Sequence, residues 1–383
     1  MTKLAINGGK PEVKGMIKPY NSIGVREGDA AETCAYHDAL SGYLGGQLRG
    51  GKYVCALEDA WSERFRVKHA IACNSATSGL LAAAFAVGLT RGDKFVVSPY
   101  TMSATAAAPM FTGAEPMFCD VEDDTFCLSA ANVSATEPYK AIVATNLFGH
   151  PSQLLRLELE CRIYRENCYL IEDNSQSPFA MENGKYAGTF GDIGVFSYNV
   201  HKHLQCGEGG ICVTDNDELA DKLRAFINHG EMAGGAIGLN LRLPEISAAI
   251  ALAQLNRADE LIGGRVEQAR AIIDAIGDIP GLRPPVTREG CSHVYYTIPF
   301  LVENKRAEFV AALKAEGVPL CEGYVAPLYR LPAFAKYARP CPVAEGLHDR
   351  RLFYFENCAW SATKERSEQI GNAFKKVAEE IKL

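Results

Sequence analysis

The side chain with the clearest chemical potential is Lys202, which stands between two histidines in the stretch "SYNVHKHLQCGEGG", Ser197 to Gly210. Most lysines are solvated surface residues, but an amine shielded from water can act as a nucleophile or a base. The two histidines and Cys206 also suggest zinc. Because the spacing His-x-His-x-x-Cys lacks a clear fourth ligand, we expect no metal site. The stretch alone still leaves open whether Lys202 is a solvated residue or a reactive amine.

Two further motifs each follow an apolar run. "CNSATSGL", Cys73 to Leu80, opens a predicted helix whose first amides, with the hydroxyl of Thr77 or Ser78, could bind a phosphate. Ordinary N-capping explains the same residues. "CYLIEDNSQS" places Glu172 and Asp173 at the end of a predicted strand, where adjacent side chains point to opposite faces. One carboxylate can therefore face a ligand crevice, and a helix cap or a salt bridge is the alternative.

These motifs together match the needs of one cofactor, pyridoxal 5'-phosphate. Its phosphate needs an anion site, its aldehyde needs a lysine amine to form a Schiff base, and its pyridine nitrogen needs a carboxylate that keeps it protonated. The three functions occur in the order helix start, strand-end aspartate and lysine within one part of the chain.

An α/β architecture has to position these motifs. Between residues 68 and 215, short apolar runs alternate with helical stretches, which predicts a mostly parallel sheet covered by helices on both faces. Such sheets bind ligands beyond the carboxyl ends of their strands, where all three motifs fall. From Leu243 a long helical pattern follows, with an expected interruption near Gly263. We expect a large domain with an N-terminal arm over residues 1–260 and a smaller α+β domain over residues 261–383.

Composition narrows the class of protein. The 383 residues are 48% hydrophobic, and the net charge of −7 comes without any basic block, so we expect no nucleic-acid partner. No apolar run is long enough to span a bilayer and the N-terminus does not read as a secretory signal, which predicts a cytoplasmic protein. The 13 cysteines form no CxxC pair and are expected to be reduced.

"GQLRGGKY", Gly46 to Tyr53, ends in Tyr where a phosphate-binding P-loop needs Ser or Thr, and no strand precedes it, so we reject a nucleotidase.

Over nearly its whole length the sequence resembles the DegT/DnrJ/StrS sugar aminotransferases, which are fold type I pyridoxal phosphate enzymes. The resemblance is carried by segments in a specific order, among them "LAINGGKP", "LRGGKYVCALE", "CNSATSGL", "NLFGHP", "IEDNSQ", "GDIGVFSYNVHKHLQCGEGGICVTD" and "GLNLRLPEISAAIALAQLNRADE". The segment "FYFENCAWSAT" departs from the commoner "LPMHPGLT" type of the family.

The resemblance implies a role for eight residues. Lys202 would carry the cofactor and move a proton, and Asp173 would pair with the pyridine nitrogen. The other implied cofactor contacts are Gln176 to the ring hydroxyl, Ala76, Thr77 and Ser197 to the phosphate, Met102 over the ring where many relatives have an aromatic residue, and Asn240 lent by a partner subunit. Tyr100 is a second candidate for the ring-covering position. Related dehydratases have histidine at the position of Lys202.

The resemblance also implies the reaction. Glutamate or glutamine would donate an amino group that is then transferred to a keto-sugar, which we expect to be nucleotide-linked. A keto-cyclitol acceptor is the alternative within the family, and a pyridoxal phosphate-binding regulatory protein without turnover is the alternative from another class. A homodimer with shared active sites is expected, and substrate specificity is expected in loops that include those around Tyr324 and Arg242.

Overall fold

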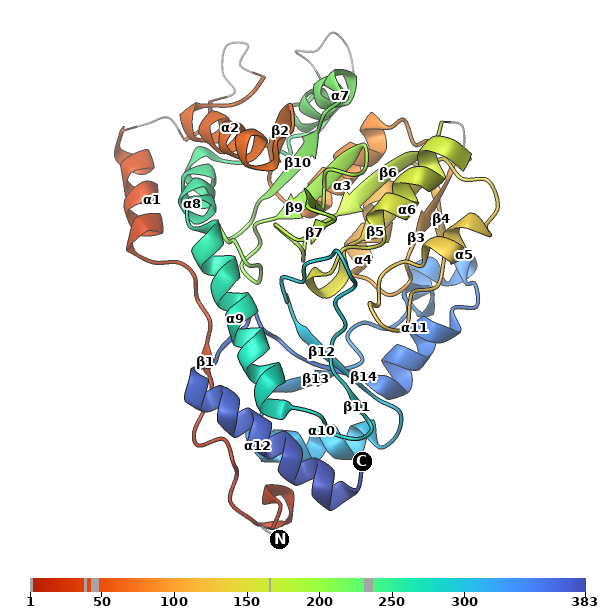
Figure 1. Cartoon of the computed structure of the whole chain (residues 1–383). Coiled ribbons are helices and arrows are strands. Elements are labelled where there is room, and N and C mark those ends of the chain that lie inside the picture. Colours follow the sequence, from red (N-terminus) through yellow and green to blue (C-terminus); the bar gives the residue numbers. More distant parts are fainter. Residues whose placement is uncertain (1–2, 38–39, 43–47, 165–166, 231–236) are drawn as a thin grey trace.

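The computed structural model describes residues 3–37, 40–42, 48–164, 167–230 and 237–383. Its main element is a seven-stranded sheet in the order β2-β10-β9-β6-β5-β3-β4 (Figure 1). Every neighbouring pair is parallel except for those of β10, which runs antiparallel to both β2 and β9. This confirms the predicted mostly parallel sheet. The strands are β2 (His69–Cys73), β3 (Lys94–Val97), β4 (Glu115–Phe118), β5 (Ala141–Thr145), β6 (Tyr169–Asp173), β9 (Ile193–Ser197) and β10 (Gly210–Thr214).

Helices cover both faces of this sheet because successive strand residues are apolar on both sides. In β3, Phe95 and Val97 pack with α3, whereas Val96 between them packs in the cluster of α6. A Cβ on Gly79 would come within 2.8 Å of Val195 Cγ1, so this glycine allows α3 to lie close to the sheet. The helices of this lobe are α1 (Val25–His37), α2 (Lys52–Phe65), α3 (Ala76–Ala86), α4 (Ser103–Met110), α5 (Ala130–Ser134), α6 (Leu154–Leu159), α7 (Asp217–Ile227) and α8 (Glu245–Leu255). A short hairpin of β7 (Met181–Glu182) and β8 (Lys185–Tyr186) lies beside it.

The expected helix interruption near Gly263 is wrong by about two turns. α8 ends at Leu255 and α9 (Ala258–Ile276) begins three residues later, so the break lies at Asn256 and Arg257. Arg257 is held there by ion pairs of 2.9 Å to Glu27 of α1 and 2.8 Å to Glu260. α9 continues through Gly263, around which a Cβ would meet no atom within 4 Å.

The lower lobe of the molecule is built on an antiparallel sheet in the order β11-β12-β14-β13. Four phenylalanines from its strands and from α10 and α12 share one core: Phe300, Phe309, Phe353 and Phe374. Its elements are β11 (Leu282–Arg283), β12 (Ile298–Val302), α10 (Arg306–Ala315), β13 (Leu320–Glu322), β14 (Leu352–Phe355) and α12 (Lys364–Ile381). α11 (Pro342–Gly346) comes from the same part of the chain but packs in the core cluster of the large sheet. α9 runs from the upper lobe to this one in Figure 1, and a division of the chain at residue 260 stays a prediction.

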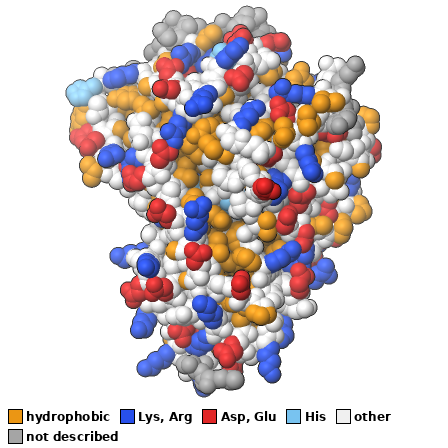
Figure 2. Space-filling view, in the orientation of Figure 1, with side chains coloured by type: hydrophobic (Ala, Val, Ile, Leu, Met, Phe, Trp, Pro, Cys, Tyr) orange, Lys and Arg blue, Asp and Glu red, His pale blue; other side chains and the backbone are white. Residues whose placement is uncertain are grey.

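The N-terminal segment packs on the lower lobe. Leu4, Val13 and Ile17 belong to the same core cluster as α12, and β1 (Lys18–Pro19) pairs with β15 (Trp360–Ser361). Figure 2 shows acidic and basic side chains interspersed over the surface, as the even distribution of charge in the sequence predicts. In the described part of the chain, no helix combines the length and apolar character that crossing a membrane requires.

Candidate functional site

A pocket of about 480 Å³ lies where β5, β6 and β9 end, at the carboxyl edge of the parallel strands. It collects the three chemically promising motifs. Seven of the eight predicted site residues line it, and these are Ala76, Thr77, Met102, Asp173, Gln176, Ser197 and Lys202. The eighth, Asn240, is exposed and forms an isolated bridge with Asn228. The structure therefore brings seven predicted residues together, while the role of each one stays a prediction.

Lys202 reaches this pocket from a tight loop that follows β9. Its amide donates to Asn199 O at 2.9 Å, and Val200 N donates to Gly207 O at 3.0 Å, so the loop folds back on itself. Gly207 has φ +89, which favours glycine at this position. The Lys202 amine lies 4.4 Å from the ring centroid of Tyr296. Desolvation lowers the pKa of Lys202 from 10.5 to about 8, against the opposing charge of Asp173.

The two histidines beside Lys202 differ in environment. His203 is buried, its Nε2 lies 2.8 Å from Val294 O, and burial lowers its pKa to about 4. His201 is exposed and lines the pocket. Cys206 Sγ is directed to the carbonyl of Glu208 at 3.3 Å. Within the described residues, no group of three His, Cys, Asp or Glu side chains could hold a metal ion.

The neighbouring carboxylates Glu172 and Asp173 separate onto the two faces of β6, as their positions on a strand predict. Glu172 turns away from the pocket and accepts hydrogen bonds from three backbone amides, those of Gly188, Phe190 and Gly191, at 2.6 to 2.8 Å. Burial raises its pKa to about 7. Its role is therefore structural.

Asp173 is the carboxylate that faces the pocket, although it is almost fully buried. Its Oδ2 accepts a hydrogen bond of 2.7 Å from Thr105 Oγ1, and its Oδ1 accepts one of 3.1 Å from Ser175 N. These two donors fix the orientation of the carboxylate. Thr105 was missed by sequence reasoning because it lies on α4, nearly 70 residues earlier, and no local pattern marks it.

Gln176 is fixed between two groups. Its Oε1 accepts a hydrogen bond of 2.8 Å from Phe148 N, and its Nε2 donates one of 2.7 Å to the hydroxyl of Tyr324. Tyr324 lines the pocket, as expected of a specificity loop, and desolvation raises its pKa to about 12. Arg242, the other residue expected there, does not line the pocket and donates to Asn228 Oδ1 at 2.8 Å.

The start of α3 forms the opposite end of the pocket. Ser75 caps the helix, its Oγ accepting from Ser78 N at 3.1 Å, so the capping interpretation holds for Ser75. Ala76 and Thr77 line the pocket at the first turn, where helix amides have no acceptor inside the helix and favour an anion. Gly210 lies against this turn, since a Cβ there would come within 2.5 Å of the Ser75 carbonyl carbon.

Met102 and Tyr100 were both considered for covering a bound ring. Met102 lines the pocket with 55% of its surface exposed. Tyr100 is fully buried and donates its hydroxyl to Gly323 O at 2.8 Å, which leaves it no access to the pocket. Of the two candidates, only Met102 is placed where it can contact a ligand.

In the stretch that resembles a P-loop, the backbone amides that could bind a phosphate are hydrogen-bonded to a carboxylate of the protein itself. Glu245 accepts hydrogen bonds from Gly51 N and Tyr53 N, both at 2.7 Å, and from Val54 N at 3.2 Å. Residues 46–47 of that stretch lie outside the described residues. The amides at the start of α2 are thus satisfied by Glu245, which agrees with the rejection of a nucleotidase.

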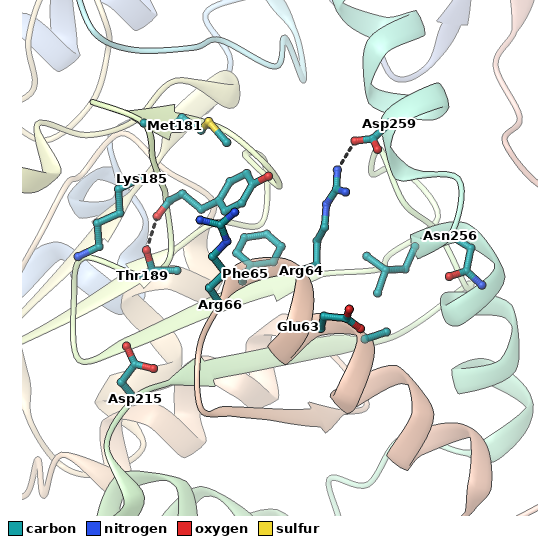
Figure 3. A pocket seen from close by; sticks show the side chains of 14 residues that line it. Glu63, Arg64, Phe65, Arg66, Met181, Lys185, Thr189, Asp215, Asn256 and Asp259 are labelled. Atoms are coloured by element: carbon teal, nitrogen blue, oxygen red, sulfur yellow. Dashed lines mark hydrogen bonds and ion pairs between the residues drawn. The ribbon is translucent and has the colours of Figure 1, made fainter.

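A larger cavity of about 770 Å³ lies near the end of α2 and shares no lining residue with the pocket of Lys202 (Figure 3). Its charges are mostly paired with the protein itself. Arg64 forms an ion pair with Asp259, Lys185 lies over the ring of Phe190, and Asp215 accepts from a backbone amide. This cavity is lined by none of the residues of the three sequence motifs.

The pocket of Lys202 fits pyridoxal phosphate in the three respects that the cofactor requires. A helix start able to hold an anion, a fixed carboxylate and a desolvated amine converge on one cavity. The volume of about 480 Å³ falls within the range of small-molecule sites.

Comparisons with known proteins identify relatives across the chain. Residues 33–371 match the DegT/DnrJ/EryC1/StrS aminotransferase family. The UDP-N-acetyl-3-dehydro-α-D-glucosamine 3-aminotransferase of Acidithiobacillus ferrooxidans is 33% identical, covering 82% of this chain and 85% of its own. A pleiotropic regulatory protein of Geobacillus stearothermophilus is also 33% identical, over 74% and 78% of the two chains. The crystal structure of a DegT DnrJ EryC1 StrS aminotransferase from Brucella abortus has a TM-score of 0.82, with 27% identity and coverage of 92% and 95%.

Proposed function

Since the chain belongs to the DegT/DnrJ/EryC1/StrS aminotransferase family and is therefore a fold type I aminotransferase, we propose that it moves the amino group of glutamate or glutamine to a nucleotide-linked keto-sugar. The observation that carries the proposal is the desolvated amine of Lys202, which shares one pocket with the carboxylate of Asp173 and the start of α3. A sugar nucleotide is preferred as the acceptor because the name of the relative from Acidithiobacillus ferrooxidans specifies one.

Pyridoxal phosphate, when bound, supplies an aldehyde that takes up the amino group and a ring that accepts electrons from the substrate carbon. The start of α3 with Ser197 would hold its phosphate, Asp173 its ring nitrogen and Gln176 its ring hydroxyl. Thr105 and the amide of Ser175 keep the Asp173 carboxylate in place for this contact. Met102 would cover one face of the ring.

Lys202 would bind the cofactor and move the proton of the substrate carbon. A base must be unprotonated to accept that proton. With a pKa of about 8, roughly a quarter of the amine is neutral near pH 7.5, against about one part in a thousand for a pKa of 10.5. Burial beside Tyr296 therefore prepares the amine for proton transfer.

A second subunit is part of this proposal. Asn240 lies outside the pocket of its own chain and is exposed, which fits a residue that reaches the phosphate in a neighbouring copy. A homodimer with shared active sites would use it in this way.

The proposal is tested with purified protein loaded with pyridoxal phosphate. Adding glutamate or glutamine should change the absorption of the bound cofactor, and adding a 3-keto or 4-keto sugar nucleotide should restore it with release of an amino sugar. Lys202→Ala should abolish both changes, whereas Lys185→Ala in the other cavity should leave them intact. The proposal is refuted if the spectrum of the loaded protein responds to no amino donor.

A regulatory protein without turnover is the second candidate, and the similarity to the Geobacillus stearothermophilus protein supports it. The same spectra distinguish the two. A loaded protein whose cofactor is retained yet unchanged by every donor would favour binding without catalysis. Assaying inososes beside the sugar nucleotides tests the keto-cyclitol alternative in the same experiment.

A further inference from the structure

A second, smaller pocket of about 170 Å³ adjoins the pocket of Lys202. The two share His201 and Tyr296, so they border each other at the ring that lies 4.4 Å from the Lys202 amine. The remaining lining residues of the small pocket are Thr297, Glu356, Cys358 and Ala359. Three of these come from the segment "FYFENCAWSAT", which departs from the commoner family pattern and has no part in the proposed cofactor contacts.

Glu356 brings a carboxylate to this pocket directly after β14. Its side chain is half-buried, and the hydrogen bond that the structure shows for it comes from the thiol of Cys321 at 3.6 Å. A thiol is a weak donor, and an ionised carboxylate accepts about four hydrogen bonds, so most of its capacity is available. Burial raises the pKa of the Tyr296 hydroxyl, and the carboxylate of Glu356 adds to that rise.

Thr297 is a second polar residue that lines this pocket. Its side chain is 3% exposed, and its Oγ1 has no hydrogen-bond partner among the described residues. Buried hydroxyls are nearly always hydrogen-bonded, so this unpaired hydroxyl, in a residue that lines the pocket, retains capacity for a partner that the structure does not hold. A carboxylate accepts hydrogen bonds, and a hydroxyl can both donate and accept them. This pair therefore points to a ligand rich in hydroxyl groups.

Charge decides which substrate this subsite suits. The donors glutamate and glutamine carry an α-carboxylate, and a diphosphate carries still more negative charge, so Glu356 would repel each of them. A neutral sugar ring carries no such charge, and neighbouring hydroxyls can donate to the two oxygens of one carboxylate. The small volume also favours a single ring over a nucleotide.

We propose that Glu356 and Thr297 form a hydroxyl-binding subsite for the sugar ring that receives the amino group, an inference that rests on the proposed function. Tyr296 lines both pockets and its ring centroid lies 4.4 Å from the Lys202 amine, so the subsite borders the pocket of the reacting amine. Glu356 is thus a specificity-determining residue for the acceptor and has no part in the reaction of the donor.

The test compares Glu356→Gln and Thr297→Val with wild type, and uses Glu289→Gln, an exposed carboxylate outside both pockets, as the matched control. All are assayed loaded with pyridoxal phosphate. The absorption change caused by glutamate alone should be unaltered in every variant. The KM for the keto-sugar that wild type aminates should rise about tenfold or more in Glu356→Gln and severalfold in Thr297→Val. An unchanged KM in both, or an equal loss in the donor reaction, overturns the subsite.

A binding measurement separates the subsite from the proposed function. Saturation-transfer NMR with inositol and methyl glycosides at millimolar concentration needs no turnover. Wild type and Glu289→Gln should both show saturation transfer from the protein to the sugar protons. Glu356→Gln should show none. If no keto-sugar is aminated but this pattern is found, the proposed function falls and the subsite stands. If wild type binds none of these polyols, or if Glu356→Gln binds them equally well, the subsite is wrong.

Discussion

Replacing Lys202 by Met should make the cofactor-free protein more stable, although it destroys the site. Desolvation lowers the pKa of Lys202 from 10.5 to about 8, and a difference of one in pKa corresponds to about 1.4 kcal/mol. The folded state therefore holds the charged amine at a cost of about 3 kcal/mol. Methionine has a similar length without the charge, so Lys202→Met should raise the free energy of unfolding by about 3 kcal/mol at pH 7.

The sign of the pH dependence follows from the same difference between the two pKa values. In the unfolded chain the amine stays protonated up to about pH 10.5, whereas in the folded chain it loses its proton above about pH 8. The unfolded state binds more protons between these values, so the stability of the wild type rises with pH across this window. The destabilisation is complete below about pH 8, and the advantage of Lys202→Met should vanish as the pH approaches 10.5.

Denaturant unfolding of the cofactor-free proteins at pH 7 and pH 9.5 measures both effects. Lys185→Met provides the control, because Lys185 is an exposed lysine of the other cavity. We expect the gain at pH 7 for Lys202→Met alone and a smaller gain at pH 9.5. If Lys202→Met were no more stable than wild type at pH 7, or if the gain in stability did not depend on pH, the result would refute the idea that the charged amine of Lys202 destabilises the folded protein.

Three further outcomes are expected. Thr105→Val removes a donor to the pocket carboxylate and should weaken pyridoxal phosphate binding about tenfold, measured by fluorescence titration. The methyl group of Gly210→Ala should push against the start of α3 and lower the affinity for pyridoxal phosphate much more than the affinity for pyridoxal. Gly263→Ala is the control, because a Cβ there meets no atom within 4 Å. It should leave both affinities unchanged and stabilise α9 by about 0.5–1 kcal/mol. Mixing inactive Asn240→Ala and Lys202→Ala proteins under exchange conditions should restore part of the activity; no recovery would contradict a shared site.

The positions of Lys202 and Asp173 could be predicted from the sequence because their placement depends on local order. Asp173 ends one apolar strand of a parallel sheet and Lys202 follows another, and the carboxyl ends of parallel strands meet at one edge. The alternation along β6 even predicts that Glu172 and Asp173 face opposite ways. The residues alone left open which of the two serves the pocket, and the family resemblance implied Asp173; the partners of Glu172 needed the structure, because the amides that it accepts from lie 16 to 19 residues later.

The rest of the site depends on contacts between distant segments. Tyr296 enters the pocket of Lys202 from the region after α9, and no periodicity links it to the motifs of the sheet. Tyr324 enters from the same region, and it was the family resemblance, not a local pattern, that placed it in a specificity loop. The helix break was misplaced for the same reason. Glycine is the usual local sign of a break, whereas here the break lies at Asn256 and Arg257, where Arg257 pairs with Glu27, 230 residues earlier. Local rules cannot anticipate a partner at that separation.

The pairing of β1 with β15 and the packing of Val13 beside α12 have a consequence for synthesis on the ribosome. The segments that meet there are among the first and the last of these residues to be translated. The lower lobe therefore cannot close its core until α12 has left the exit tunnel, while the seven-stranded sheet can assemble earlier. Until then the apolar side chains of the early segment stay exposed and accessible to chaperones. In a chain truncated before residue 364 they would remain exposed.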